Sequence, residues 1–191
     1  MTSDDDPDLA ALEKLSGELS AALRSIADDQ WSLATPCPDW DLSALVDHMT
    51  GGNWFTRWIF DGLSADEAMT RTVEQFSGGG ASAVQATSSV ADQLTVFTRP
   101  GVLDRTWSHV VGDLTGRQIL RLRLQDLIVH TWDVGETVDA PAGLHADLVN
   151  WGMSELADEA SLTAKHFQLV SIRTFETGQN TATTYLRRFG R

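Results

Sequence analysis

The sequence has very little cysteine, no long apolar run and no secretion signal. Its 191 residues contain a single cysteine, Cys37, which excludes an internal disulfide framework and fits a reducing cytoplasm. No uncharged apolar stretch reaches the roughly 18 residues that a membrane-spanning helix needs. Residues 1–8 are acidic and polar, whereas a secretory signal has a basic start and an apolar centre. These absences predict a cytoplasmic protein without a membrane segment.

Positive charge is also scarce. The chain has 14 Lys and Arg residues against 27 Asp and Glu residues, which gives a formal net charge of −13. Nucleic acids are bound by clustered Lys and Arg side chains that contact phosphates, and anionic membranes attract the same side chains. The composition therefore argues against nucleic acids and membranes as partners.

The apolar residues recur at the spacing of amphipathic helices. Four long helices are expected, over about residues 8–28, 42–59, 81–98 and 115–137, with a shorter one over 65–76 between the second and the third. Asp39 or Asp41 is expected to cap the second helix. The strand signal is weak throughout. The pattern therefore predicts an all-α fold, a helical bundle, in a single domain over residues 1–191.

The remaining segments are expected to be short or irregular. Residues 102–112 are irregular or briefly extended, and a further helical segment follows Pro141 near residues 144–159. An irregular tail begins at about residue 163. Within it, residues 170–175 fit a strand and residues 181–189 a terminal helix. These segments are the short additional C-terminal elements of the predicted bundle.

Asp126 and His130 give the strongest local signal for chemistry. They lie four residues apart in the expected helix 115–137, so both side chains leave the same helix face, one turn apart. That face is otherwise apolar, and a buried charge is costly unless it is paired or binds a metal ion. A simple Asp–His hydrogen bond in the core and a pair of metal ligands both meet this requirement.

His48 offers a third ligand from the second expected helix, where it lies beside the apolar stripe. Alone, such a histidine is more often a core residue, but bundle metal sites are built from inward side chains on facing helices. His48, Asp126 and His130 supply three ligands and leave an open position, as in catalytic zinc sites. The same set suits nickel, iron or cobalt. We therefore expect a divalent metal ion, with zinc as the first choice.

Two segments carry a family resemblance. One is Thr35-Pro36-Cys37-Pro38-Asp39-Trp40-Asp41-Leu42, continuing through Leu45-Val46-Asp47-His48, and the other is Asp126-Leu127-Ile128-Val129-His130-Thr131-Trp132-Asp133-Val134. Together they resemble the DinB/YfiT-like metalloproteins, most closely the largely actinobacterial mycothiol-dependent maleylpyruvate isomerase N-terminal branch. The resemblance spans about residues 9–136. It implies a DinB-like four-helix bundle whose metal ligands match His48, Asp126 and His130.

The chain differs from the isomerase branch in two respects. In the isomerase branch that this chain resembles, the first residue of the second ligand pair is a Glu. This chain has Asp126 there, whose side chain is shorter. The isomerases also carry a second, C-terminal domain that contributes to substrate handling, while only residues 137–191 follow Glu136 here. These differences argue against maleylpyruvate itself as the substrate.

Two residues near the ligands have alternative interpretations. Asp133 follows His130 by three residues and can orient its imidazole as an outer partner, although a capping or surface role fits equally well. Cys37 is expected to pack as a buried residue, with a reactive thiol near a helix N-terminus as the alternative.

The seven tryptophans of the chain, Trp40 among them, are expected to anchor the core. Trp54 and Trp58, which lie four residues apart beyond His48, can also form the wall of a pocket over the metal ion. Asn53 is close enough along the same helix to reach into that pocket.

The resemblance implies a metal-dependent enzyme that uses a low-molecular-weight thiol such as mycothiol. The metal lowers the pKa of the bound thiol, and the thiolate attacks a small electrophile in a transfer, conjugation or isomerisation. Its expected partners are then a small-molecule thiol and an electrophilic substrate. The sequence does not decide between a monomer and a homodimer. One alternative is a non-catalytic bundle that binds metal or a small molecule. Another is a metallohydrolase with Asp133 or Glu136 as its general base.

Overall fold

The computed structural model describes residues 6–38, 40–76, 82–138 and 146–156. Within these residues the chain forms six helices and one two-stranded antiparallel sheet. In chain order the elements are α1 (Pro7–Ser25), α2 (Leu42–Phe60), α3 (Ala65–Phe76), α4 (Ala83–Phe97), β1 (Thr106–His109), β2 (Gly112–Thr115), α5 (Gly116–Val138) and α6 (Ala146–Glu155). None of these helices is both long enough and apolar enough to cross a membrane.

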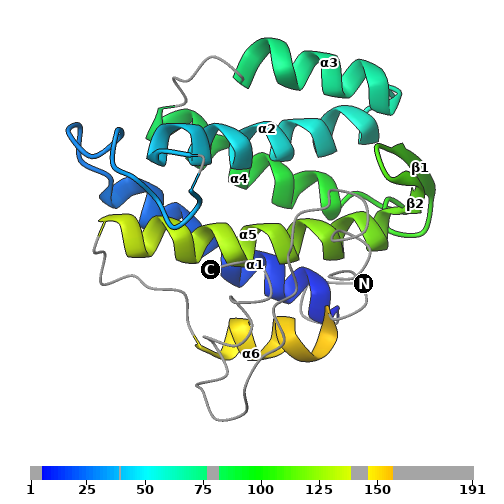
Figure 1. The fold of residues 1–191 in the computed structure, drawn as a ribbon. Coiled ribbons are helices and arrows are strands. Elements are labelled where there is room, and N and C mark those ends of the chain that lie inside the picture. The colour runs from blue at the N-terminus through cyan, green and yellow to red at the C-terminus, as the bar shows by residue number, and fades with distance from the viewer. Residues whose placement is uncertain (1–5, 39, 77–81, 139–145, 157–191) are drawn as a thin grey trace.

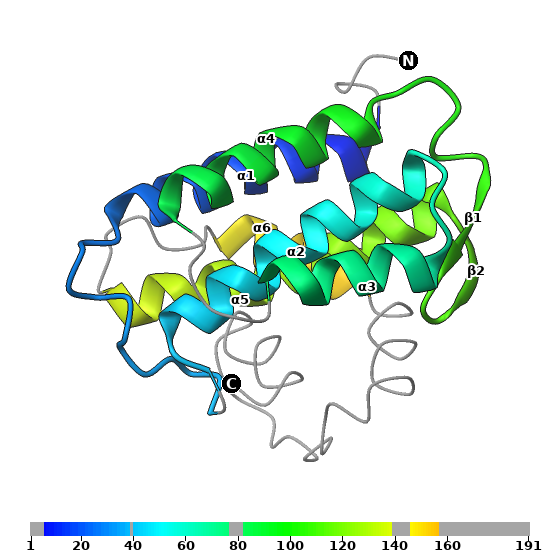
Figure 2. The ribbon, with the colours of Figure 1, turned by 90° about the horizontal axis from the view of Figure 1, so that it is seen from above.

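Helices α1, α2, α4 and α5 form a four-helix bundle (Figure 1). Helices α4 and α5 each pack against both α1 and α2, which closes the bundle. Helix α3 packs along α2, and α6 packs against α5 (Figure 2). The sheet lies at one end of the bundle, and the loop between α1 and α2 lies at the other. The predicted all-α bundle is therefore confirmed.

The helix starts follow ordinary capping chemistry. The carboxylate of Asp6 accepts hydrogen bonds from two backbone N–H groups in the first turn of α1, and Pro7 occupies a position where no N–H is needed. The Asp41 side chain caps α2 in the same way. Ser82 and Gln85 form a capping box at the start of α4. Polar residues directly before apolar stripes therefore set where these helices begin.

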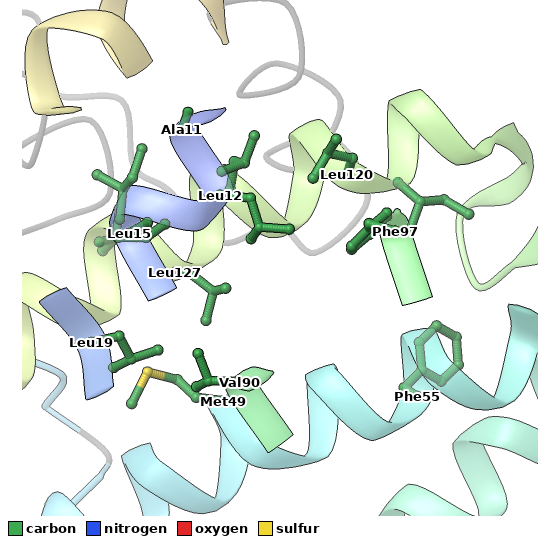
Figure 3. Packing of buried hydrophobic residues seen from close by; sticks show 14 of the residues in the cluster. Ala11, Leu12, Leu15, Leu19, Met49, Phe55, Val90, Phe97, Leu120 and Leu127 are labelled. Atoms are coloured by element: carbon green, nitrogen blue, oxygen red, sulfur yellow. The ribbon is translucent and has the colours of Figure 1, made fainter. Parts of the chain in front are cut away.

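The core fills the space between the four helices. In α1, Leu12, Leu15 and Leu19 recur at intervals of three and four residues and have no exposed surface. Burying one such side chain contributes about 1.5–3 kcal/mol to stability. Figure 3 shows these leucines packed with residues of the other three helices, including Met49, Val90, Phe97, Leu120 and Leu127.

The helix ranges expected from the sequence agree with the structure to within a few residues at each end. Residues 102–112, expected to be irregular or briefly extended, contain turns and then β1, which pairs with β2. The predicted strand at 170–175, the helix at 181–189 and the irregular tail lie outside the described residues. The assignment of a single domain stays a prediction.

The start of α5 depends on a close approach of two backbone segments. A Cβ atom on Gly116 would lie only 2.1 Å from the carbonyl oxygen of Val102. Gly116 N–H donates to the carbonyl of Arg105, and Arg117 N–H donates to that of Leu103. Glycine is therefore required where the hairpin turns into α5, the helix that carries two of the predicted ligands.

Candidate metal centre

The loop between α1 and α2 is folded on itself by Thr35. Its hydroxyl donates to the carbonyl of Trp40 at 2.8 Å and accepts from the backbone N–H of Cys37 at 3.1 Å. Pro36 and Pro38 flank Cys37 and have no backbone N–H to donate, so the hydroxyl provides bonds that a regular element would otherwise make. This compact loop places Trp40 directly before α2.

The three predicted ligands come from two helices that pack against each other. His48 lies in the first half of α2, while Asp126 and His130 lie one turn apart on α5. The Nε2 atoms of His48 and His130 lie 3.3 Å and 3.4 Å from Oδ1 of Asp126. The three ligand atoms all lie within 4.8 Å of one another, so the fold brings together the residues that the sequence singled out.

The cluster is buried on one side and open on the other. His130 is 7% exposed, whereas the side chains of His48 and Asp126 keep 37% and 29% of their surface exposed. A small molecule can therefore approach His48 and Asp126 from solvent, while His130 faces the interior.

The ionisation of the cluster is governed by its opposite charges. Burial alone would raise the pKa of Asp126, but the charges of His48, His130 and Arg123 hold this pKa well below its usual range. Burial alone would lower the pKa of His130, yet Asp126 and Asp133 raise it to about 9. Near neutral pH and without a metal ion, the Asp126 carboxylate is thus paired with a protonated His130.

Asp133 lies behind His130, as the outer-partner interpretation requires. Its Oδ2 atom lies 2.9 Å from Nδ1 of His130, and the carboxylate has no exposed surface. Ligating histidines usually donate their second ring N–H to such an acceptor, which fixes the tautomer and the ring orientation. The Nε2 atom of His130 is then directed toward Asp126.

Cys37 is buried, as expected, and lies beside the same histidine. Its thiol, a ring nitrogen of His130 and a carboxylate oxygen of Asp133 form a second group whose atoms lie within 4.8 Å of one another. His130 belongs to both groups. Because the first group includes the partly exposed His48 and Asp126, it is the better candidate for a site that must admit a small molecule.

The aromatic wall of the cluster is Trp40. Its ring centroid lies 4.6 Å from that of His48 and 5.9 Å from that of His130. The ring centroids of Trp54 and Trp58, the pair considered for this wall, lie 5.9 Å apart, and the Trp58 ring lies beneath Arg71. Among the described residues, Trp40 is therefore the tryptophan whose ring packs against the two histidines. Sequence reasoning placed Trp40 in the core, although its position next to the proline-rich loop was the available signal.

Asn53 is linked to the cluster through a residue that the sequence did not single out. Its Oδ1 atom accepts a hydrogen bond from Arg123 at 2.8 Å, and Arg123 donates to Oδ2 of Asp126 at 2.8 Å. Both Asn53 and Arg123 are buried. The available signal for Arg123 was its spacing, since it lies three residues before Asp126 on the same helix.

The residues of the cluster fit a divalent metal ion. Two imidazole nitrogens and one carboxylate oxygen form a donor set that zinc and other divalent transition metals accept. The Asp133 contact supplies the outer partner that ligating histidines normally have. With three protein ligands and a solvent-facing side, the arrangement leaves space for an exogenous ligand.

Comparison with known proteins identifies the family. The family model for the mycothiol maleylpyruvate isomerase N-terminal domain matches residues 12–135, more than half of the chain. Uncharacterized proteins from two strains of Mycobacterium tuberculosis are 28% identical over 161 residues, which cover 84% of this chain and 81% of each relative.

Solved structures support the same assignment at the level of the fold. Two structures of mycothiol-dependent maleylpyruvate isomerase, one of a histidine-to-alanine mutant, align with a TM-score of 0.52 and 16% identity over 71% of this chain. The alignment covers 63% of the isomerase chain, so this protein spans less than two thirds of its length. Taken with the match over residues 12–135, the chain belongs to the mycothiol maleylpyruvate isomerase N-terminal domain family.

Proposed function

We propose that this protein is a metal-dependent enzyme that uses a low-molecular-weight thiol to transform a small electrophile. His48, Asp126 and His130 hold a divalent metal ion, for which zinc is the first choice. The observation that carries the proposal is the convergence of their ligand atoms within 4.8 Å, on a solvent-accessible side of the bundle. The reaction class is isomerisation, conjugation or transfer through the thiol.

Each residue of the cluster has a role in this proposal. Asp126 and the Nε2 atoms of the two histidines bind the metal, and Asp133 keeps Nδ1 of His130 engaged. Trp40 covers the His48 ring and excludes water from one side of the site. When bound, the metal ion supplies Lewis acidity, which stabilises the thiolate form of a thiol cosubstrate. No protein side chain needs to act as the nucleophile.

Family membership supports mycothiol as the thiol. The matched domain belongs to mycothiol maleylpyruvate isomerases, and the solved neighbours are mycothiol-dependent enzymes. Family membership does not identify the electrophile, because part of the isomerase chain has no counterpart in the alignment. A cytoplasmic location agrees with a reduced thiol cosubstrate.

The hydrolase alternative has less support. A metallohydrolase needs a free general base beside the metal-bound water. Asp133 is engaged by His130, and Glu136 is exposed on the outer face of α5. These are the two bases that the sequence offers in this region.

The first experiment measures bound metal by mass spectrometry in protein purified without a His tag and reloaded with zinc. We expect about one ion per chain, and loss of this ion in His48→Ala and Asp126→Ala. His109→Ala is the matched control, because His109 lies on β1 against Phe55, outside the ligand cluster. Metal retained equally by all variants would disprove the centre.

The second experiment tests the thiol. Calorimetry with mycothiol is expected to show binding to the zinc-loaded protein and much weaker binding to the metal-free protein. A zinc-loaded protein that binds no thiol would contradict the proposed thiol chemistry and would favour a non-catalytic metal-binding bundle or a metallohydrolase. With thiol binding established, turnover is assayed with small α,β-unsaturated acids and alkylating electrophiles, and His48→Ala is expected to lack activity.

A further inference from the structure

Arg123 is a buried cation at the contact between α5 and α2. Its residue surface is 8% exposed, and a buried guanidinium is costly unless its hydrogen bonds and charge are matched. One terminal nitrogen, Nη1, donates to Oδ2 of Asp126 at 2.8 Å. The other, Nη2, donates to Oδ1 of Asn53 at 2.8 Å and to the carbonyl of Met49 at 3.4 Å. The guanidinium is thus held between the candidate metal centre and α2.

The space for this guanidinium comes from Gly52. A Cβ atom at this position would lie 2.4 Å from Nη1 and 2.8 Å from Cζ of Arg123. Such distances are far below van der Waals contact. Any side chain at position 52 must therefore displace the guanidinium or α2 itself.

A chain of hydrogen bonds fixes Arg123 from the far side. Asn53 donates through Nδ2 to Oγ of Ser89 at 3.0 Å, and Ser89 donates to the carbonyl of Ala86 at 2.7 Å. Asn53 and Ser89 are each 2% exposed. Because the amide nitrogen of Asn53 is engaged by Ser89, its oxygen faces Arg123. Helices α4, α2 and α5 are thereby joined to one carboxylate.

The two oxygens of Asp126 have different partners as a result. Oδ2 accepts from Arg123, whereas Oδ1 faces the Nε2 atoms of His48 and His130. A free aspartate can turn about its terminal bond and offer both oxygens to a cation. We propose that Arg123 is a positioning residue that keeps Oδ2 engaged, so that Asp126 ligates the metal through Oδ1 alone. This inference rests on the proposed function, because it presupposes a metal ion at the cluster.

The consequence is an open coordination position. A carboxylate that binds through one oxygen occupies one position, and one that binds through both occupies two. Arg123 therefore reserves a position for the exogenous thiol. Its positive charge also offsets the negative charge of Asp126, which leaves the bound cation more electrophilic.

Cobalt substitution tests the inference directly, because the visible absorption of Co²⁺ weakens as its coordination number increases. The variants are Arg123→Met, which removes the donor, and Gly52→Ala, which keeps the guanidinium but takes away its space. Both are expected to lose intensity in the visible bands and to give similar spectra, although their chemical changes differ. Arg123→Lys keeps a positive charge and a donor, so it is expected to retain more of the wild-type intensity than Arg123→Met.

Arg117→Met is the control, because Arg117 pairs with Asp6 and Asp8 and has no recorded contact with the ligand cluster. It is expected to change stability and to leave the cobalt spectrum unchanged. Circular dichroism checks that each variant is folded. A wild-type cobalt spectrum in folded Arg123→Met, or in folded Gly52→Ala where Arg123→Met does not fold, would overturn the positioning role while leaving the metal centre intact. A wild-type protein that binds no Co²⁺ or Zn²⁺ would overturn the proposed function, and the inference with it.

Discussion

Nδ1 of His130 lies 2.9 Å from Oδ2 of Asp133, and both side chains are buried. The two residues are three positions apart on α5, so the contact is made within one helix and does not depend on how the bundle packs. It orients the ring with its second nitrogen toward the ligand cluster. Asp133 is therefore the residue through which the orientation of His130 can be tested separately from metal ligation.

Asp133→Asn is expected to weaken zinc binding by roughly ten- to hundredfold, because outer partners of ligating histidines contribute about that much to affinity. The amide keeps the shape of the carboxylate but loses its charge. Competition with a chromophoric chelator measures the affinity. Glu136→Gln, an exposed change on the same helix, is the control. Equal affinities for wild type and Asp133→Asn would show that the contact is only structural.

Trp40 is expected to report metal binding by fluorescence. Its ring lies 4.6 Å from that of His48, so a bound paramagnetic ion such as Cu²⁺ or Co²⁺ should quench its emission. The chain has seven tryptophans, and the other six should contribute less to the change. Trp40→Phe is expected to remove most of the metal-dependent quenching, whereas Trp54→Phe should retain it. The opposite pattern would show that Trp54, and not Trp40, lies beside the metal ion.

The pH dependence of the metal-free protein follows from His130. Its pKa is raised from 6.5 to about 9, so the charged ring stabilises the fold fully below about pH 6.5, and this contribution is lost as pH rises through 9. Metal binding requires the neutral ring, so zinc affinity should increase over the same range. From pH 6.5 to 9, the melting temperature measured in EDTA should therefore fall, while the zinc affinity measured by titration should increase. His130→Gln is expected to remove much of the pH dependence of unfolding.

Asp6→Ala is expected to lower the free energy of unfolding by about 1–2 kcal/mol through loss of the α1 cap. Hydrogen bonding to Arg117 is the main cause that lowers the pKa of Asp6 below 3.8. The difference between wild type and Asp6→Ala should therefore persist above about pH 4 and shrink in stronger acid. Urea unfolding measures it, with Asp28→Ala in an exposed loop as control. Zinc affinity should not change, since Asp6 has no recorded contact with the cluster.

The helices and the three candidate ligands could be predicted because each depends on local spacing. Apolar intervals of three and four residues define the inward faces, and the same intervals align Asp126 with His130. Trp40 and Arg123 were missed for a physical reason. Trp40 is placed by a loop whose closure depends on one hydroxyl, and Arg123 is buried only because Gly52 on another helix leaves space. Contacts of this kind depend on packing between segments, which periodicity does not encode.

The fit between Gly52 and Arg123 also limits which sequences this bundle tolerates. Apolar contacts between helices accept many combinations of side chains of similar volume. The contact between Gly52 and the Arg123 guanidinium accepts far fewer combinations of side chains, because a larger residue at position 52 requires a smaller one at position 123. Positions 52 and 123 should therefore behave as a compensatory pair. In relatives that carry a side chain at the position of Gly52, we expect a shorter residue in place of Arg123 and a carboxylate ligand that is held in some other way.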